Sequence, residues 1–218
     1  MLAFDILKSG VQPIAMELLD PTMSGLLSLI PVNENASNQY MLAIELGGSR
    51  EAVNRQEKEV WRLRHNINIS AIATEEESEL IWASIRDVGR NGVPLPDLII
   101  KSISLPKDVK QILSGLRNIK DEVGMKAAFL SSITNGITHT HWWKDDESRF
   151  GLLAVINFVR ELLCTLNGYA VVEVCPIDVK RDIDVWGFTG SQIRVMKRIK
   201  EEFDPRGTLN PGRFVGGI

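Results

Sequence analysis

The sequence predicts an α+β fold, a mostly antiparallel sheet with helices packed on one face, built as one or two ferredoxin-like units. Strand and helix patterns are intermixed along the 218 residues, and no fixed repeat period is present. Several neighbouring strand patterns can pair antiparallel, most clearly across Asn135-Gly136, a dipeptide typical of hairpin turns. Apolar residues make up 44% of the chain and charged residues 24%, which is typical of a globular protein.

The first half of the chain predicts helices that begin at recognisable capping residues. Helices are expected over residues 1–9, 23–30, 50–64 and from Thr74 to Gly89 or Gly92, and strands over residues 13–19, 40–46 and 67–73. Asp20 or Thr22 caps the second helix and Ser49 caps the third, because short oxygen-bearing side chains accept hydrogen bonds from free amides at a helix start. Thr74 and Glu77 have the spacing of a capping box.

The second half continues the mixture of strands and helices. Strands are expected over residues 97–105, 126–134, 137–142 and 169–174, and helices over residues 106–119, 147–166 and 191–203. Residues 175–190 are expected to form a loop. Residues 90–96, which contain a glycine and two prolines, are the best candidate for a joint between the halves.

Charge and composition argue against several classes of protein. The net charge of −3 argues against nucleic acid as the main partner, because phosphate binding needs a basic surface. No apolar run approaches the roughly 18 residues of a membrane-spanning helix. The N-terminus lacks the pattern of a signal peptide, so a cytoplasmic location is expected. Cys164 and Cys175 have mostly apolar neighbours and are expected to be buried free thiols in a reducing compartment.

The chain contains no complete catalytic motif, so its catalytic residues are unknown at this level. His139 and His141 alternate along a predicted strand, which places both rings on one face. One interpretation is a metal or catalytic pair, with Asp145, Asp146 and Glu147 as further oxygen ligands. The other is a partly exposed strand face. Two histidines without a certain third ligand are a weak metal signal, so no metal is expected.

The C-terminal segment is highly specified for the end of a chain. Pro205 and Pro211 each fix φ, and Gly207 and Gly212 can take positive φ, so a rigid, multiply turned segment is expected after helix 191–203. Chain termini are usually disordered unless they are tied down. This segment is therefore expected to lie against another surface.

The same segment resembles a known family signature. Residues 198–214, RIKEEFDPRGTLNPGRF, resemble the C-terminal signature of FAD-linked oxidases of the vanillyl-alcohol oxidase type. Residues 168–187, GYAVVEVCPIDVKRDIDVWG, look like the same region of the glycolate oxidase E-type subunit. Residues 42–56, LAIELGGSREAVNRQ, are similar to the start of the family's C-terminal domain. The resemblance covers most of the chain.

The resemblance implies that residues 1–218 are the C-terminal, substrate-side domain of a flavoprotein, with the N-terminal FAD-binding domain absent. Its implied role is to cover the flavin and shape the substrate pocket of a glycolate-like 2-hydroxy-acid oxidase or dehydrogenase, and to be inactive alone. By motif position, Asn210, Gly212 and Arg213 contact the cofactor, FAD. A structural clamp onto the sheet is the alternative for Asn210 and Arg213.

The resemblance also implies partners. These are an FAD-binding domain or subunit and, as in glycolate dehydrogenase complexes, an iron–sulfur subunit and a catalytic subunit. Two separated cysteines cannot hold a cluster in this chain. The catalytic subunit's Gly-His-x-Gly-Asp-Gly-Asn-x-His metal-binding stretch is missing here, so its metal site is not carried over. Two alternatives stay open: a stand-alone interaction module of ferredoxin-like fold that docks a partner subunit, and a metal-assisted enzyme built on His139 and His141.

Overall fold

The computed structural model describes residues 2–29, 39–64, 72–88, 94–144, 149–187 and 190–218. The predicted α+β fold is confirmed. Within the described residues the strands are β1 (Ala15–Leu19), β2 (Met41–Glu45), β3 (Leu98–Ile103), β4 (Lys126–Ser132), β5 (Ile137–Trp143) and β6 (Tyr169–Val174). The helices are α1 (Leu2–Lys8), α2 (Pro21–Leu26), α3 (Arg50–Leu63), α4 (Glu75–Arg86), α5 (Val109–Val123), α6 (Arg149–Thr165), α7 (Ile177–Lys180) and α8 (Gln192–Phe203).

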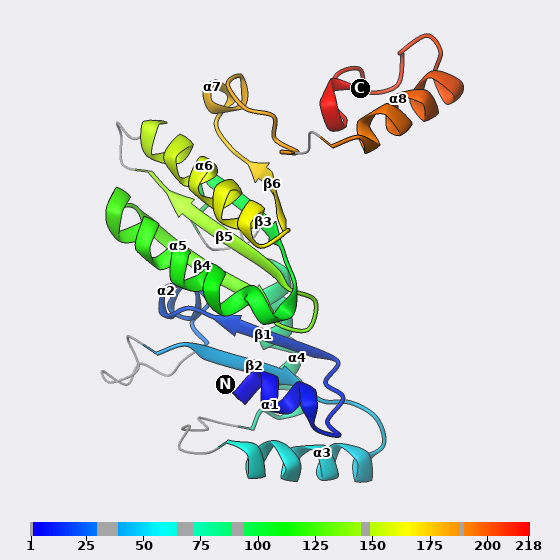
Figure 1. Cartoon of the computed structure of the whole chain (residues 1–218). Helices are drawn as coiled ribbons and strands as arrows, with labels where there is room; N and C mark the ends of the chain where they lie inside the picture. The colour runs from blue at the N-terminus through cyan, green and yellow to red at the C-terminus, as the bar shows by residue number, and fades with distance from the viewer. Residues whose placement is uncertain (1, 30–38, 65–71, 89–93, 145–148, 188–189) are drawn as a thin grey trace.

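The six described strands form one sheet in the order β2-β1-β4-β5-β3-β6, and every neighbouring pair is antiparallel (Figure 1). The contiguous segment from β3 to β6 has the element order βαββαβ, with its first and third strands side by side at the centre. This is the expected ferredoxin-like unit. Strands β1 and β2 extend the same sheet beyond β4, so the two halves of the chain share one sheet.

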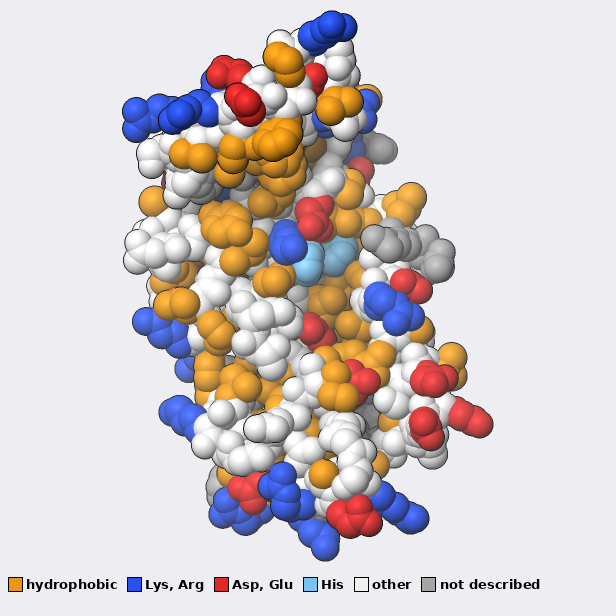
Figure 2. Space-filling model, turned by 90° about the vertical axis from the view of Figure 1, so that its right-hand side faces the viewer, with side chains coloured by type: hydrophobic (Ala, Val, Ile, Leu, Met, Phe, Trp, Pro, Cys, Tyr) orange, Lys and Arg blue, Asp and Glu red, His pale blue; other side chains and the backbone are white. Residues whose placement is uncertain are grey.

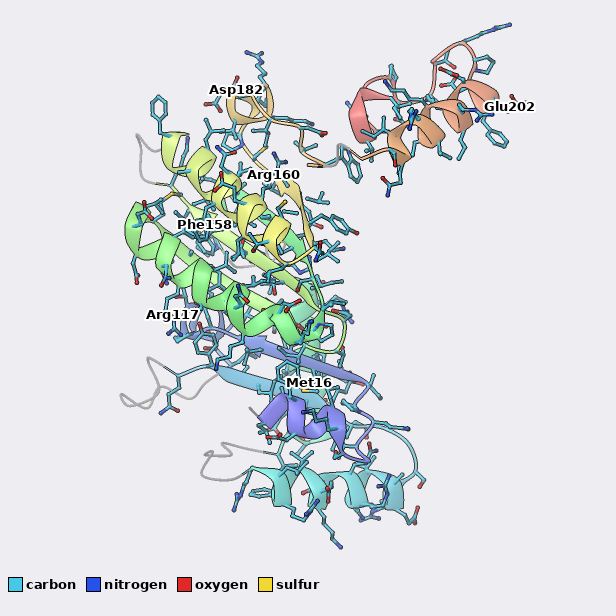
Figure 3. The ribbon with its side chains drawn as sticks, in the orientation of Figure 1. Met16, Arg117, Phe158, Arg160, Asp182 and Glu202 are labelled. Atoms are coloured by element: carbon cyan, nitrogen blue, oxygen red, sulfur yellow. The ribbon has the colours of Figure 1, made fainter. Side chains whose placement is uncertain are left out.

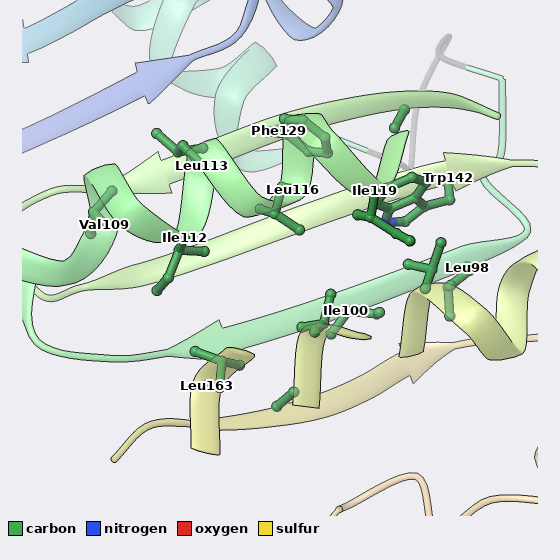
Figure 4. Packing of buried hydrophobic residues seen from close by; sticks show 14 of the residues in the cluster. Leu98, Ile100, Val109, Ile112, Leu113, Leu116, Ile119, Phe129, Trp142 and Leu163 are labelled. Carbon is green, nitrogen blue, oxygen red and sulfur yellow. The ribbon is translucent and has the colours of Figure 1, made fainter. Parts of the chain in front are cut away.

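The main core lies between the sheet and helices α5 and α6. The helical spacing of Ile112, Leu116 and Ile119 gives α5 one buried face, which packs on side chains of the central strands (Figure 4). The rings of Phe129 on β4 and Trp142 on β5 lie 5.7 Å apart in this core. Burial of each such side chain contributes roughly 1.5–3 kcal/mol, so this layer supplies much of the folding free energy.

The opposite face of the sheet is covered only in part. A smaller cluster, in which Met23 of α2 and Ile85 of α4 pack on Leu19, Ala128 and Leu130, covers the face near β1 and β4. Helices therefore lie on both faces at this end of the sheet, whereas the helices of the ferredoxin-like unit lie on one face as expected. Strands β3, β5 and β6 keep a face that these helices leave open.

Asp20 joins α2 to the sheet. Its Oδ1 atom accepts hydrogen bonds from Met23 N at 2.8 Å, as the N-cap of α2, and from Phe129 N at 3.0 Å. Burial raises the pKa of this carboxyl group, and the two amides oppose that effect because they stabilise the charged form. Of the two capping residues considered, Asp20 is therefore the one that caps the helix.

The other local expectations have mixed outcomes. The Ser49 cap and the Thr74 capping box are confirmed. The strand expected over residues 67–73 and the joint at residues 90–96 lie mostly outside the described residues. The expected loop 175–190 contains the one-turn helix α7. Both cysteines are free, but Cys164 is exposed on α6 rather than buried, and Cys175 is only partly buried.

The described part of the chain contains no helix with the length and apolar composition needed to cross a bilayer.

Candidate functional site

Four ionisable side chains meet on the open face of β5, β3 and β6. Alternation along β5 places His139 and His141 on this face, and the register places Lys101 of β3 directly beside His139. Glu173 comes from β6, the next strand, and its Oε2 atom lies 3.8 Å from His139 Nε2. Figure 2 shows the two described histidines side by side above a hollow in this face. We call these four residues the histidine cluster.

The two histidines differ in burial. The side chain of His139 is 32% exposed, in agreement with the expected partly exposed strand face. His141, two residues farther along the same strand, is only 4% exposed. The Nδ1 atom of His141 is buried and has no hydrogen-bond partner among the described residues. A buried polar atom of this kind normally has a hydrogen-bond partner. The Nδ1 atom of His141 could therefore form one more hydrogen bond on this face.

Burial keeps both imidazoles neutral at pH 7. It lowers the pKa of His139; the carboxylate of Glu173 opposes this effect, and the cation of Lys101 adds to it. Burial, helped by the neighbouring His139 and opposed by a hydrogen bond with the Ala128 backbone, lowers the pKa of His141 to about 4. Neutral imidazole has one ring nitrogen free to accept a proton. The histidine cluster therefore combines proton acceptors, a cation and a carboxylate within reach of one another.

The rest of this face is mostly apolar. Ile99 and Val171 are partly buried next to the cluster, on β3 and β6. Glu17 of β1 lies farther along the sheet, where burial raises its pKa and a hydrogen bond with Ser132 opposes that shift. A mostly apolar surface with a few convergent polar groups is typical of a ligand-binding surface.

The described residues give no support to the metal interpretation. No group of three or more His, Cys, Asp or Glu side chains within them could hold a metal ion. Residues 145–147, considered above as oxygen ligands, lie outside the described part of the chain.

The second candidate region is the tail that follows α8. Asp204 is buried and fixes this tail: its carboxylate accepts hydrogen bonds from Thr208 N and Leu209 N at 2.9 Å each and pairs with Lys200 at 2.6 Å. These contacts hold the pKa of Asp204 well below its usual range. The predicted rigid, turned segment is thus explained by one carboxylate that binds two consecutive backbone amides.

Asn210, Gly212 and Arg213 lie beyond this clamp and are exposed. Asn210 and Gly212 have positive φ values of 46° and 70°, and Arg213 N donates to the Asn210 carbonyl at 3.1 Å. The tail contacts the loop after β6, where the rings of Trp186 and Phe214 lie 5.6 Å apart. Figure 1 shows α8 and the tail beyond the β6 end of the sheet, so they form a region separate from the histidine cluster.

Sequence reasoning had singled out His139 and His141 but missed Lys101 and Glu173. Lys101 is one charged residue in an otherwise mostly apolar strand, which was a usable signal. Its position beside His139 depends on the pairing of β3 with β5, two strands that are separated in sequence by α5 and β4.

These features define an α+β domain with two distinctive regions. One is an open sheet face that carries the histidine cluster, and the other is a C-terminal tail that is held by Asp204. The family model for the C-terminal domain of FAD linked oxidases matches residues 2–168 and 186–214. The chain therefore belongs to the family of FAD-linked oxidase C-terminal domains. This confirms the broader part of the resemblance found in the sequence, and FAD as the cofactor of the full-length protein.

One solved structure agrees at the level of the fold, and a second matches at a lower TM-score. 4-Ethylphenol oxidase from Gulosibacter chungangensis matches with a TM-score of 0.55 and 14% identity, over 91% of this chain and 46% of that chain. Alkyldihydroxyacetonephosphate synthase matches with a TM-score of 0.46 and 16% identity, over 94% of this chain and 40% of that chain. The chain thus spans less than half the length of either protein. No curated protein matches it.

Proposed function

We propose that this chain is the C-terminal domain of a flavin-dependent, glycolate-like 2-hydroxy-acid oxidase or dehydrogenase. In this proposal it covers the flavin, shapes the substrate pocket and is inactive alone. Membership of the FAD-linked oxidase family supports the flavin chemistry. The observation that carries the proposal is the open sheet face, where Lys101 and Glu173 accompany two neutral imidazoles.

The residues present fit one side of a flavin site. A flat, largely apolar ring system suits the apolar sheet face around the cluster, where Ile99 and Val171 lie. At the tail, the exposed guanidinium of Arg213 offers paired donors to a phosphate or carboxylate. Gly212 and Asn210 expose backbone for close approach of the cofactor. Bound FAD supplies the capacity to accept a hydride, which no side chain can supply.

The histidine cluster has a role in this proposal. Lys101 attracts the carboxylate of a 2-hydroxy acid, because its cation lies on the face that the substrate meets. His139 accepts the proton of the substrate hydroxyl, and Glu173 stabilises the resulting imidazolium from 3.8 Å. The buried neutral His141 limits the hydration of this pair. The proposed partners are an FAD-binding domain or subunit, with iron–sulfur and catalytic subunits, in the cytoplasm.

The test is to purify the chain alone and then combine it with the flavin-binding polypeptide. Alone, it should show no flavin absorbance and no turnover of glycolate or lactate. In the combined flavoprotein, Lys101→Met should raise the KM for glycolate at least tenfold and leave the flavin spectrum unchanged. The exposed Lys107→Met variant is the matched control. Stoichiometric FAD and turnover by the isolated chain would contradict the proposal.

A further inference from the structure

Helix α8 carries large apolar side chains that contact little of the chain. Val195, Ile199 and Phe203 recur every four residues, which places them along one side of the helix. Their exposed fractions are 58%, 54% and 81%. We call these three residues the α8 stripe. Single exposed apolar residues are ordinary, but a row on one side of a helix indicates a surface that binds another apolar surface.

The tail covers only the other edge of this helix. Ile193 lies close to Gly216, and Lys200 Nζ donates to the Leu209 carbonyl at 2.6 Å, so the tail folds back along this edge. Among the described elements, no other helix or strand packs extensively on α8. Figure 3 shows α8, marked by Glu202, well apart from Arg160 and Phe158 on α6. The α8 stripe therefore lies on the side that the tail leaves free.

The energetics favour a partner for this surface. A helix of 12 residues is marginal in water without tertiary packing. Burial of each apolar side chain of the stripe would add to its stability, as it does in the core. The segment from residue 191 to residue 218 also contains six Lys or Arg and three Asp or Glu, in a chain with a net charge of −3. A partner surface that fits this segment is apolar at its centre and acidic at its rim.

We propose that the α8 stripe is the docking surface for the flavin-binding half of the protein, whether that half is a domain or a subunit. The inference rests on the proposed function. Residues 186–214, which include all of α8, belong to the matched family domain although α8 adds little to the sheet. More than half of the 4-ethylphenol oxidase chain lies outside the match, so a protein of this fold has a second part large enough to cover the stripe. The stripe is also continuous in sequence with Asn210 and Arg213, the proposed cofactor contacts.

The test is co-purification of the tagged chain with the co-expressed flavin-binding polypeptide. The double variant Ile199→Asp with Phe203→Asp should recover at least tenfold less flavin-binding polypeptide than the wild type. The control is Arg194→Ala with Glu201→Ala, which changes the exposed polar side of the same helix, opposite the stripe, without changing its net charge; recovery should stay within twofold. The thermal midpoint of the stripe variant, purified alone, should match that of the wild type, because the stripe makes few contacts within the chain.

Each other outcome overturns the inference in a recognisable way. Equal recovery of the flavin-binding polypeptide with the stripe variant would leave the proposed function standing and remove the stripe from the interface. A lowered thermal midpoint of the variant alone would make the stripe part of this chain's own core. A dimer of the chain that needs the stripe and persists beside the flavin-binding polypeptide would make a second copy the occupant. Failure of the wild type to bind that polypeptide would reject the proposed function as well.

Discussion

Asp204 determines the conformation of several residues around it. It lies one residue beyond α8, and its carboxylate binds the amides of Thr208 and Leu209 while Lys200 supplies the opposite charge. The turns that present Asn210 and Arg213 follow directly. One buried carboxylate therefore sets the geometry of the exposed residues that we propose to contact the cofactor.

Replacement of Asp204 by Asn should loosen the tail, because the amide cannot pair with Lys200 and offers one acceptor oxygen where the carboxylate offers two. Hydrogen exchange of the amides at Thr208 and Leu209 should accelerate, while exchange in β3 and β5 stays unchanged. The pKa of Asp204 is lowered in the folded chain, so its contribution is complete above the ordinary value of about 3.9 and is lost as the pH falls below it. The exposed neighbour Glu201→Gln is the control, and equal exchange in both variants would reject the clamp.

His141 makes the folded state sensitive to acid. Its pKa falls from an ordinary value of about 6.5 to about 4 on folding, so the unfolded chain binds more protons between these values. The contribution of His141 to the free energy of unfolding is fully present above pH 6.5. As the pH falls towards 4, this contribution decreases by about 2–3 kcal/mol.

His141→Phe keeps an aromatic ring of similar width and removes the titration. Its free energy of unfolding should vary less between pH 7 and pH 4.5 than that of the wild type, as measured by urea denaturation. His139→Gln, at the more exposed position, should change the pH dependence less. Parallel pH curves for the wild type and His141→Phe would show that His141 is not held neutral by the fold.

At the scale of elements, the β4–β5 hairpin depends on a glycine that has no room for a side chain. Gly136 has a φ of 72°, and its carbonyl accepts a hydrogen bond from Ser104 N at 3.1 Å. A Cβ atom at this position would collide with the Ser104 carbonyl oxygen. The turn is thus packed directly on the end of β3, which is the neighbour of β5 in the sheet.

Gly136→Ala and Gly124→Ala separate backbone strain from steric collision. Gly124, at the end of α5, has a similar φ of 65° but open space around it. Alanine should cost about 1–2 kcal/mol at Gly124, from the left-handed backbone alone. At Gly136 it should cost about 2 kcal/mol more, because the hairpin must also move away from β3. Thermal or urea unfolding of the two variants measures the difference, and equal losses would contradict close packing at Gly136.

At the scale of the whole molecule, the sequence predicted what local signals determine. Alternating apolar residues, the Asn135-Gly136 turn and the caps at Ser49 and Thr74 are local, and they predicted most of the described elements, though not α7, and the α+β class. The exposure of Cys164 and the burial of His141 were not predictable in this way. They depend on which side of a helix or sheet receives a neighbouring layer, and sequence periodicity does not identify that side.

Only part of the candidate site could be predicted from the sequence, for a similar reason. His139 and His141 are two residues apart, so their shared face could be read from the sequence. Lys101 and Glu173 join them through the register of β3 with β5 and β6, which is fixed by packing far along the chain. The tail residues were found because their motif is contiguous. Their contact with a cofactor stays a prediction.

The arrangement of the sheet has a consequence for how the chain folds. Strands β3 to β6 pair only with one another and, through β4, with β1, so one continuous segment contains a complete four-stranded nucleus. Strand β1 must instead find β4 across more than a hundred residues, a slow event because long loops close at an entropic cost. In pulsed hydrogen exchange during refolding, we therefore expect β3 to β6 to become protected before β1 and β2. Simultaneous protection of the six described strands would show that they fold as one cooperative unit. It would contradict a pathway in which β1 and β2 pair with a β3–β6 unit that has already folded.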